Sequence, residues 1–481
     1  MRKKVISMGV FLLLLFSSLS FPQPENTSAN TPSLTENAPA PTPIETTRTD
    51  TIDNGQIETK ITAFPNGDRY WIKRLHFTDK TSQPYIFQLK IPGAGGTFTY
   101  TQNIDGTKKL KTVSLKNGSL PEYAGILSTD SYHMIMSYPA SYMPGQRQTM
   151  KEYKSSPVSI AKTNDGYILT LRFTRHPDAV GEIWALESKN QLIDLNKAQL
   201  AAQWTRVNIG NDRKWSWDGM YEKTPPSYTP SGEDVYWRSP INYAANAFVM
   251  EDGSRAADDL GWLMLKTTLA NQNADGYWES GPRSDWLWKD YQIDGDFYDT
   301  RFNTDHALAL LRGSHAYSDA EFLAASRRYA DWLIRHADDE HVAVKGEKQE
   351  GWLVPDYSHP GAHKRAHTSL NHQLAEMNYL LEMYLDTKNE AYRTYAEKLL
   401  YGIKNTKSFW IKPNGDLNYA YEDGKGIKAD YPILTYNDLW EAQRLLKTVK
   451  GSTDPDLADL MASKKRWMDK NKIEGYNTRP L

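Results

Sequence analysis

Amphipathic segments in the second half of the chain recur at a fixed interval, and this repeat constrains the fold more than any other feature. His306 and His372 stand 66 positions apart in matching apolar contexts. A third copy follows at about 65 positions, where Glu376 aligns with Glu441. Equal spacing of helical hairpins is typical of repeat architectures, in which each unit buries its apolar face against its neighbours. The sequence therefore predicts stacked helical hairpins.

The apolar period in this half is 3.6 residues, as expected for helices with one buried face. With a further segment in front, the pattern gives about four hairpins. Such hairpins can bury their apolar stripes as an incomplete (α/α) toroid, whose loops gather at one mouth on a rigid scaffold. The expected helical segments are 254–271, 300–318, 320–337, 367–386, 389–406, 432–449 and 454–470.

Before residue 193 the apolar period is close to two, and Gly, Asn, Asp and Pro separate the segments. Short strands with such turns predict an antiparallel β-sandwich. The fold class is thus α+β and multidomain, with a β-rich domain over 51–192 and a helical toroid domain over 193–475. The expected strands include 85–91, 97–104, 109–115, 132–138 and 167–174.

The N-terminal residues have the pattern of an export signal. Residues 2–4 are basic and residues 5–16 are apolar, and a small residue follows at Ser20. We expect a signal peptide over 1–20, with an uncleaved anchor as the alternative. Residues 21–50 are rich in Pro, Thr, Ser and Asn, which predicts a disordered linker that holds the folded part away from a membrane or cell wall. The protein is expected to be bacterial, and either secreted or held on the extracellular face of the membrane.

Bulk composition excludes several function classes. The 481 residues carry a formal net charge of −2, so electrostatic recruitment of nucleic acid is not expected. The absence of cysteine excludes disulfides, zinc–thiolate sites and a thiol nucleophile. The 15 tryptophans and 29 tyrosines either fill a large core or form surfaces on which sugar rings stack.

An aromatic and acidic loop runs from Gly276 to Ala307. Trp278 and Trp286 are candidates for stacking on sugar rings. Asp305 is explained equally well as a favourable charge at a helix N-terminus. The candidate carboxylates for acid–base chemistry in this loop are Glu279, Asp285, Asp299 and Asp305.

Three histidines follow at intervals of four: His359, His363 and His367. On a helix this spacing lines one face and can bind a metal. Pro360 and Gly361 interrupt any such helix, so we expect neither a metal nor another cofactor. Contact with an acidic substrate and a purely structural role remain alternatives for these histidines.

Four tyrosines surround a polar connection near the C-terminus. Tyr419 and Tyr421 alternate as in a short hairpin, Tyr431 directly precedes a proline at a helix entrance, and Tyr436 lies one turn inside that helix. Tyrosine acts as an acid or base only when its pKa is lowered or a partner shares the proton.

These stretches together resemble the C-terminal helical domain of D-glucuronyl C5-epimerases over about residues 240–450. The similarity rests on the order and spacing of "FYDTRFNTDHALALLRG", "PDY…SLNHQLAEMNYLLEMYLDTKNEAY" and "DLNYAY…KADYPILTYNDLWEAQRLL". It implies an isomerase that removes the C5 proton of a uronate residue in a polysaccharide and returns a proton to the opposite face, without metal or nucleotide. Carried over by position, the catalytic tyrosines are Tyr298, Tyr419 and Tyr431.

Two positions differ from that family. An Arg-His pair is expected after the strand tyrosine, where this chain has Ala420-Tyr421 and then the acidic Glu422. A histidine is expected where Pro432 stands. Arg301 and Lys428 are candidates to supply the missing contacts to a carboxylate. The full set of candidate substrate-binding residues is Trp278, Trp286, Arg301, His306, Tyr357 and His372.

Three function classes remain open: an epimerase-type isomerase, a glycoside hydrolase or polysaccharide lyase on the same toroid, and a non-catalytic cell-wall or polysaccharide-binding protein. A lyase would begin with the same C5 proton abstraction, using tyrosine and histidine. Hydrolysis requires two carboxylates that flank the scissile bond. Carboxylates available for that role are Glu279, Asp299, Asp305 and Asp430.

Overall fold

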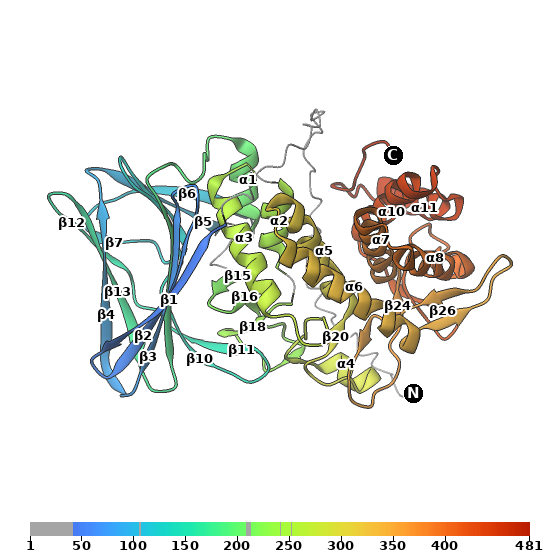
Figure 1. Cartoon of the computed structure of the whole chain (residues 1–481), viewed down its shortest axis with the longest axis horizontal. Coiled ribbons are helices and arrows are strands. Elements are labelled where there is room, and N and C mark those ends of the chain that lie inside the picture. The colour runs from blue at the N-terminus through green and yellow to red at the C-terminus, as the bar shows by residue number, and fades with distance from the viewer. Residues whose placement is uncertain (1–41, 105–106, 208–212, 241, 252) are drawn as a thin grey trace, which may run out of the picture.

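The computed structural model describes residues 42–104, 107–207, 213–240, 242–251 and 253–481. Antiparallel sheets form one end of the molecule and helical hairpins form the other (Figure 1). The expected signal peptide and most of the expected linker lie outside the described residues.

The larger sheet contains thirteen strands in the described part of the chain, and each pairs antiparallel with its neighbours. The strands are β1 (Ile44–Ile52), β2 (Gly55–Ala63), β3 (Arg69–Phe77), β5 (Gly96–Ile104), β6 (Thr107–Ser114), β8 (Gly125–Thr129), β9 (His133–Met136), β10 (Ala140–Pro144), β11 (Thr149–Tyr153), β14 (Val180–Ser188), β15 (Arg213–Ser216), β16 (Gly219–Lys223) and β18 (Val235–Arg238). Their order is β15-β16-β18-β11-β10-β14-β9-β8-β5-β6, and β3, β2 and β1 branch from β14.

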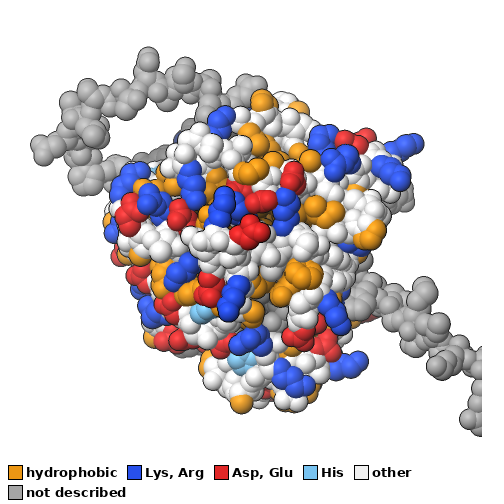
Figure 2. Space-filling model, turned by 90° about the vertical axis from the view of Figure 1, so that its right-hand side faces the viewer, with side chains coloured by type: hydrophobic (Ala, Val, Ile, Leu, Met, Phe, Trp, Pro, Cys, Tyr) orange, Lys and Arg blue, Asp and Glu red, His pale blue; other side chains and the backbone are white. Residues whose placement is uncertain are grey.

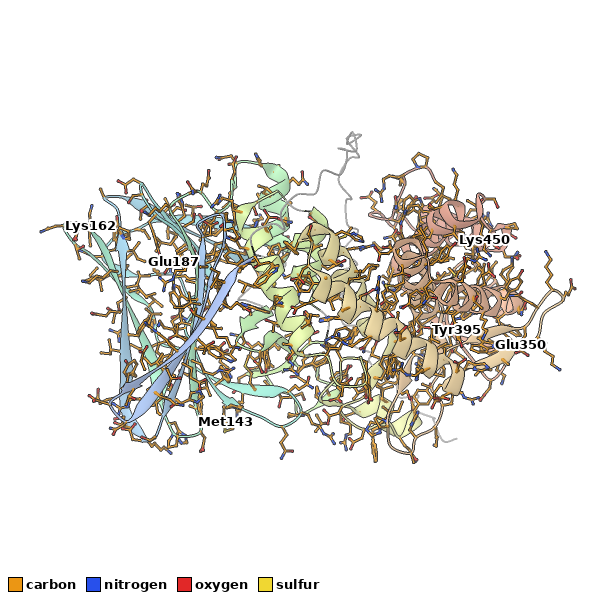
Figure 3. The ribbon with its side chains drawn as sticks, viewed as in Figure 1. Met143, Lys162, Glu187, Glu350, Tyr395 and Lys450 are labelled. Carbon is orange, nitrogen blue, oxygen red and sulfur yellow. The ribbon has the colours of Figure 1, made fainter. Side chains whose placement is uncertain are left out.

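A second sheet faces the first across a shared apolar core. Leu169, Leu171 and Phe173 alternate along one of its strands and point inward, as the two-residue period of a strand requires. They pack in one cluster with Leu75 and Ile183 of the larger sheet. Figure 3 shows side chains filling the space between the two sheets. The second sheet has the order β4 (Thr81–Pro92), β13 (Gly166–Arg175), β12 (Ser159–Lys162) and β7 (Gly118–Ser119).

Two expected domain boundaries are wrong. The linker expected to reach residue 50 ends earlier, because β1 pairs with β2 along its whole length through a turn at Asp53-Asn54. Asn54 adopts a left-handed φ of 59°, which asparagine tolerates, and backbone pairing does not require apolar side chains. The helical domain expected from residue 193 begins later, since β15, β16 and β18 join the larger sheet.

The helical end confirms the seven helices expected from the apolar period. Asp299, Asp319, Asn389 and Asp454 each cap a helix by accepting a backbone N–H, which explains where four of the helices begin. The helices are α1 (Ala198–Val207), α2 (Tyr243–Glu251), α3 (Arg255–Ala270), α4 (Asp285–Tyr291), α5 (Thr300–Ala316), α6 (Ala320–Glu340), α7 (Leu370–Thr387), α8 (Glu390–Asn405), α9 (Lys407–Trp410), α10 (Leu434–Lys450) and α11 (Pro455–Lys470).

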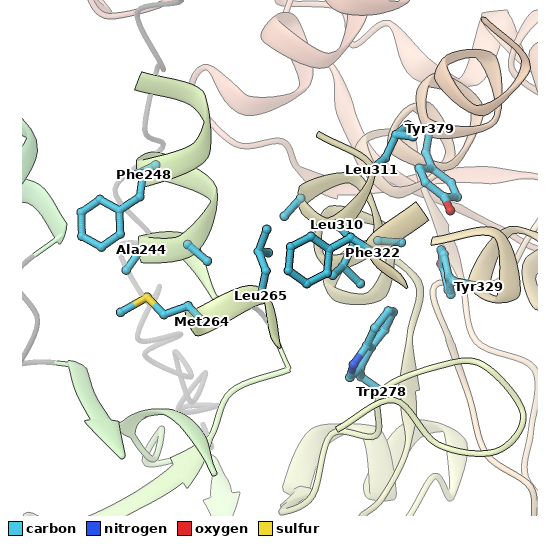
Figure 4. Packing of buried hydrophobic residues seen from close by; sticks show 14 of the residues in the cluster. Ala244, Phe248, Met264, Leu265, Trp278, Leu310, Leu311, Phe322, Tyr329 and Tyr379 are labelled. Atoms are coloured by element: carbon cyan, nitrogen blue, oxygen red, sulfur yellow. The ribbon is translucent and has the colours of Figure 1, made fainter. Parts of the chain in front are cut away.

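The described helices form hairpins α2–α3, α5–α6, α7–α8 and α10–α11. One helix of each hairpin contacts the next, so that α2, α5, α7 and α10 form a row. Side chains of successive hairpins interlock in one core, from Phe248 through Leu265 and Phe322 to Tyr379 (Figure 4). The same cluster includes Trp184 of the larger sheet, so the helical array and the sheet share a continuous core.

Short strands tie together the loops that precede α5, α7 and α10. β20 (Tyr298–Asp299) directly precedes α5 and pairs with β23 (Tyr357–Ser358). β24 (Thr368–Ser369) directly precedes α7 and pairs with β25 (Asn418–Glu422), which continues into β26 (Lys425–Ala429). These pairings bring residues from three hairpins to one end of the row. The remaining short strands are β17 (Tyr228–Thr229), β19 (Arg283–Ser284), β21 (Val342–Val344) and β22 (Gly351–Leu353).

Acidic and basic side chains intermingle over the C-terminal helical end of the molecule (Figure 2). A mixed surface of this kind gives no single-sign field that would attract a polyanion over the whole face. Of the helices in the described ranges, none combines the length and apolar character needed to cross a bilayer.

Candidate active site

Three part-exposed tyrosines meet where the loops before α7 and α10 are tied together. Tyr419 on β25 and Tyr431 before α10 contact each other edge to face, with ring centroids 5.7 Å apart. Tyr419 also packs on the ring of His367 at 5.6 Å, and Tyr357 on β23 packs on the same ring at 5.9 Å. We call Tyr357, Tyr419 and Tyr431 the tyrosine cluster. It brings three tyrosine rings from separate loops together, two of them against one histidine.

A fully buried carboxyl lies between two imidazoles beside this cluster. Asp356 Oδ2 stands 3.3 Å from Nε2 of His367 and 3.8 Å from Nε2 of His372. Its other oxygen accepts the backbone N–H of Ser369 at 2.6 Å. Burial by itself raises the pKa of Asp356, but the two histidines and the Ser369 N–H outweigh burial and leave the pKa below its usual value. Asp356 is therefore a carboxylate at neutral pH.

The second imidazole of this pair is neutral. Burial lowers the pKa of His372 to about 4, although the negative charge of Asp356 opposes the shift. Nδ1 of His372 is hydrogen-bonded to the Thr300 hydroxyl at 2.8 Å. His372 was expected to contact substrate, but it is buried beneath the cluster and contacts Asp356 instead.

Asp299 is a second buried carboxyl near the cluster. Its pKa is raised, whereas that of Asp356 is lowered. Asp299 caps α5 by accepting the backbone N–H of Phe302 at 2.9 Å. Burial raises the pKa of Asp299 to about 8, and the negative charge of Asp356 adds to the increase. Asp299 is therefore protonated near pH 7 and can donate a hydrogen bond or a proton.

The pKa of each tyrosine in the cluster is raised, so the hydroxyls keep their protons at neutral pH. Burial is the main cause of a raised pKa for Tyr431, to about 12, and the charge of Asp299 adds to it. Burial likewise raises the pKa of Tyr357 and of Tyr419 well above the usual value. The hydroxyls are hydrogen-bond donors at neutral pH, and a partner must accept a proton before one of them acts as a base.

Positive charge near the cluster is scarce. Arg301 is held by Asp305 at 2.9 Å and by Asp438 at 2.7 Å, so two carboxylates already neutralise it. The ammonium group of Lys428 lies 5.2 Å from the centre of the Trp286 ring, and Trp286 in turn packs near His367. Lys428 is exposed and has a left-handed φ of 61°. It makes no ion pair with the described residues, which leaves it available to an anionic ligand.

The expected catalytic residue Tyr298 lies outside the tyrosine cluster. Its side chain is 2% exposed, and its hydroxyl shares a hydrogen bond of 2.9 Å with that of Tyr329 in the core. The reason is the strand register. Asp299 pairs with Tyr357, and Tyr298 pairs with Ser358. Neighbouring residues of a strand face opposite sides, so Asp299 shares a face with Tyr357 and Tyr298 faces away.

Two expected sugar-binding residues, Trp278 and His306, also lie elsewhere. Trp278 is buried and donates from its indole N–H to the Thr268 carbonyl at 2.8 Å. His306 packs on the Trp278 ring at 4.9 Å, and burial lowers its pKa to about 3. Both line a small pocket between the larger sheet and α3, together with Arg238 and Glu279. This pair is therefore part of the junction between sheet and helices.

The remaining expected carboxylates and histidines have local partners. Asp430 is bound by buried Lys464 at 2.8 Å, and Asp285 accepts from the Thr229 hydroxyl at 2.9 Å. His363 contacts the Gly361 carbonyl at 2.9 Å. Throughout the described ranges, no group of three or more His, Asp or Glu side chains is arranged to hold a metal ion, so His359, His363 and His367 do not form a metal site there.

No family model and no curated protein matches the chain, so the resemblance to C5-epimerases stays a prediction. Among solved structures, a D-mannose isomerase aligns with a TM-score of 0.41 and 14% identity, over 57% of this chain and 70% of that one. A family 76 glycoside hydrolase from a bovine Bacteroides thetaiotaomicron strain aligns with a TM-score of 0.38 and 10% identity, over 83% and 75%.

An unsaturated glucuronyl hydrolase from Bacillus sp. GL1, described as responsible for the degradation of glycosaminoglycan, aligns with a TM-score of 0.33 and 15% identity, over 48% of this chain and 60% of that one. These three names belong to enzymes of carbohydrate chemistry. At such scores the likeness carries no argument about the reaction, which must rest on the residues of the site.

Three polar residues of the site escape detection from the sequence. Tyr291 is a candidate from the sequence only for stacking on sugar rings, and Asp356, within the "PDY" stretch, has no role assigned from the sequence. Glu422 reads as an acidic residue in a place where a uronate site needs positive charge. The hydroxyl of Tyr291 lies 2.8 Å from Glu422 Oε1 and 2.8 Å from His367 Nδ1. Only the pairing of β24 with β25 brings these residues together.

Proposed function

We propose that this protein is a carbohydrate-active enzyme that exchanges the C5 proton of uronate residues in a polysaccharide, with the tyrosine cluster as its reactive site. The observation that carries the proposal is the contact between Tyr419 and Tyr431 beside the buried His367–Asp356 pair. Two hydroxyls from different loops can face the two sides of a sugar ring, as proton removal and return require.

The reaction requires one proton acceptor and one donor. The acceptor tyrosine must first lose its own proton, then take hydrogen from C5, and the electron pair left on carbon is delocalised into the adjacent carboxyl group. The other tyrosine then gives a proton to C5 from the opposite face and becomes the new phenolate. Because burial raises the pKa of Tyr419, the acceptor tyrosine must release its proton to water before it acts as a base, and a nearby positive charge is needed to hold the phenolate.

The carboxyl group of the substrate also needs stabilisation as negative charge develops on it. Protonated Asp299 can donate a hydrogen bond to that group, since a neutral carboxyl kept protonated by its surroundings is a strong donor. Lys428 supplies a positive charge from the rim, and Trp286 beneath it offers an aromatic face to a sugar ring. These roles replace the Arg-His contacts expected from the resemblance.

Hydrolysis is the second candidate, and the raised pKa of Asp299 favours it. A general acid for glycosidic bonds must hold a proton near neutral pH, which a pKa of about 8 provides. Hydrolysis also requires a second, accessible carboxylate. Asp356 is fully buried, and Asp305 and Asp438 are already paired with Arg301. Proton exchange is therefore the preferred function.

The test is incubation with glucuronate-, mannuronate- and galacturonate-containing polymers in deuterated water. We expect deuterium at C5 without new chain ends, measured by NMR and mass spectrometry. Unsaturated ends would identify a lyase, and saturated reducing ends would identify a hydrolase. Exchange should be lost in Tyr419→Phe and Tyr431→Phe.

The matched control is Tyr395→Phe, in which the same hydroxyl is removed from an outer helix, where it bonds Asp338 at 2.6 Å. This variant should exchange deuterium like the wild type. Absence of C5 label with every polymer, or label that persists in both cluster variants, would overturn the proposed function.

A further inference from the structure

The ring of His367 is held at both nitrogens by polar partners. Its Nδ1 lies 2.8 Å from the Tyr291 hydroxyl, which lies 2.8 Å from Glu422 Oε1. Its Nε2 faces Asp356 Oδ2 at 3.3 Å, an ion-pair distance, and neither of these two buried atoms has a hydrogen-bond partner among the described residues. A carboxylate thus stands at each end of the chain Glu422–Tyr291–His367–Asp356.

The hydrogen bonds in the series Glu422–Tyr291–His367 place a proton on Nδ1 of His367. Burial raises the pKa of Tyr291, and Glu422 adds to the increase, so Tyr291 keeps its single proton. That proton is donated to Oε1 of Glu422. The oxygen of Tyr291 must then accept a hydrogen bond, and its donor is Nδ1–H of His367.

The other ring nitrogen faces a negative charge. Asp356 is a carboxylate, and His372 beside it is neutral. A buried carboxylate is costly unless it is paired, so its charge must be balanced by the remaining neighbour. That neighbour is Nε2 of His367. Both nitrogens of this ring therefore have a reason to carry a proton.

We propose that His367 is a buried imidazolium, clamped between Asp356 and the Tyr291–Glu422 pair, and that it supplies the positive charge of the site from beneath Tyr419 and Tyr357. Its ring contacts both tyrosines, at 5.6 Å and 5.9 Å between centroids. A fixed cation there favours phenolate formation and stabilises charge developing above it. Tyr291, Glu422 and Asp356 are then positioning residues.

The acidic Glu422 has a positioning role in this arrangement. Its side chain faces Tyr291 and completes the clamp, so its charge reaches the substrate only through His367. The catalytic part of the proposal rests on the proposed function, but the charge of the ring can be measured without substrate. The other titratable groups near this ring are Lys428, which lies over Trp286, and His372. His372 is uncharged near pH 7 because burial lowers its pKa.

The first test is long-range ¹H–¹⁵N NMR of the full ¹⁵N-labelled chain at about pH 7.5, with His367→Gln to assign the signal. We expect both ring nitrogens of His367 in the protonated range. Asp356→Asn keeps an acceptor for the Ser369 N–H but removes the charge, so Nε2 should move to the unprotonated range. A single protonated nitrogen in the wild type would overturn the proposal.

The second test uses Tyr291→Phe and Glu422→Gln, which preserve shape and remain informative if Asp356→Asn fails to fold. Tyr291→Phe removes the acceptor of Nδ1–H and should shift that signal, with a fall in kcat of about 10- to 100-fold at unchanged KM. Glu422→Gln keeps the hydrogen bond and should lie between this variant and the wild type. An unmoved His367 signal in Tyr291→Phe contradicts the clamp. If no polymer reacts while the wild-type ring is doubly protonated, the proposed function fails and the buried cation stands.

Discussion

Asp299 and Tyr357 are partners in the antiparallel pairing of β20 with β23, so their side chains leave the strands on the same face. Tyr298, one position earlier, faces the core with the hydroxyl of Tyr329. The titratable group that shares a face with Tyr357 is therefore the carboxyl of Asp299, whose pKa burial raises to about 8.

Replacing Tyr298 by phenylalanine should change stability and leave activity intact. The variant loses one buried hydrogen bond with Tyr329, which costs about 1 kcal/mol of unfolding free energy. Urea denaturation measures that loss, and C5 exchange measures activity. A loss of exchange as large as that of Tyr431→Phe would mean that Tyr298 takes part in the reaction, and it would contradict the argument from strand register.

Asp299 should make the folded protein less stable as pH rises. Its folded-state pKa of about 8 lies above the ordinary 3.8. Between these values the unfolded chain releases a proton that the folded chain keeps, so unfolding becomes easier with rising pH. Asp299→Asn cannot ionise, so we expect it to be more stable relative to the wild type at about pH 8 than at about pH 5, measured as the difference between their unfolding free energies. Parallel pH slopes for the two proteins would argue against a protonated Asp299.

Lys428 should select anionic substrates. Lys428→Met removes the rim cation above Trp286, and we expect binding of a uronate polymer to weaken about tenfold, as for the loss of one charge-assisted contact. Calorimetry with the intact polymer and with its carboxyl-reduced form separates charge from shape. Lys425→Met changes an exposed lysine of the same hairpin and should have little effect. Equal losses for the charged and reduced polymers would rule out selection by charge.

Lys464 should be essential for stability. It is fully buried and contacts Asp416 at 2.7 Å and Asp430 at 2.8 Å. Lys464→Met removes the cation that the two buried carboxylates share, although Thr435 still donates to Asp430 and Lys412 stays near Asp416. We expect a loss of roughly 3–5 kcal/mol of unfolding free energy. Replacing Asp416 and Asp430 by asparagine in the same chain should restore much of it. Thermal and urea denaturation provide the measurement, and a variant as stable as the wild type would contradict this account.

Seven of the helices in the described residues follow from the sequence, because periodicity and caps are local properties, whereas α1, α2, α4 and α9 are not predicted from it. The segment expected at 300–318 is α5 over Thr300–Ala316, with Asp299 as its cap. The short strands beside the site carry no such signal. β20 and β23 contain two residues each, and which of Tyr298 and Asp299 faces Tyr357 is set by pairing between distant loops.

The repeat predicts the helices but not which positions of successive helices are equivalent. His306 and His372 match in the alignment, yet His306 is the seventh residue of α5 and His372 is the third residue of α7. His372 contacts Asp356, whereas His306 packs on Trp278. This difference of four residues is about one helical turn, so the two histidines meet different neighbours. Histidine roles were therefore not available from the repeat alone.

The last hairpin, α10–α11, carries Tyr431 into the site, and Lys464 on α11 holds the preceding Asp430. In a stacked array each unit is supported by its neighbours, so separation of α10 from α7 would withdraw Tyr431 while the earlier hairpins stay folded. Warming should then abolish a reaction at the tyrosine cluster before the sheets unfold, and the temperature of inactivation would report the stability of this one hairpin.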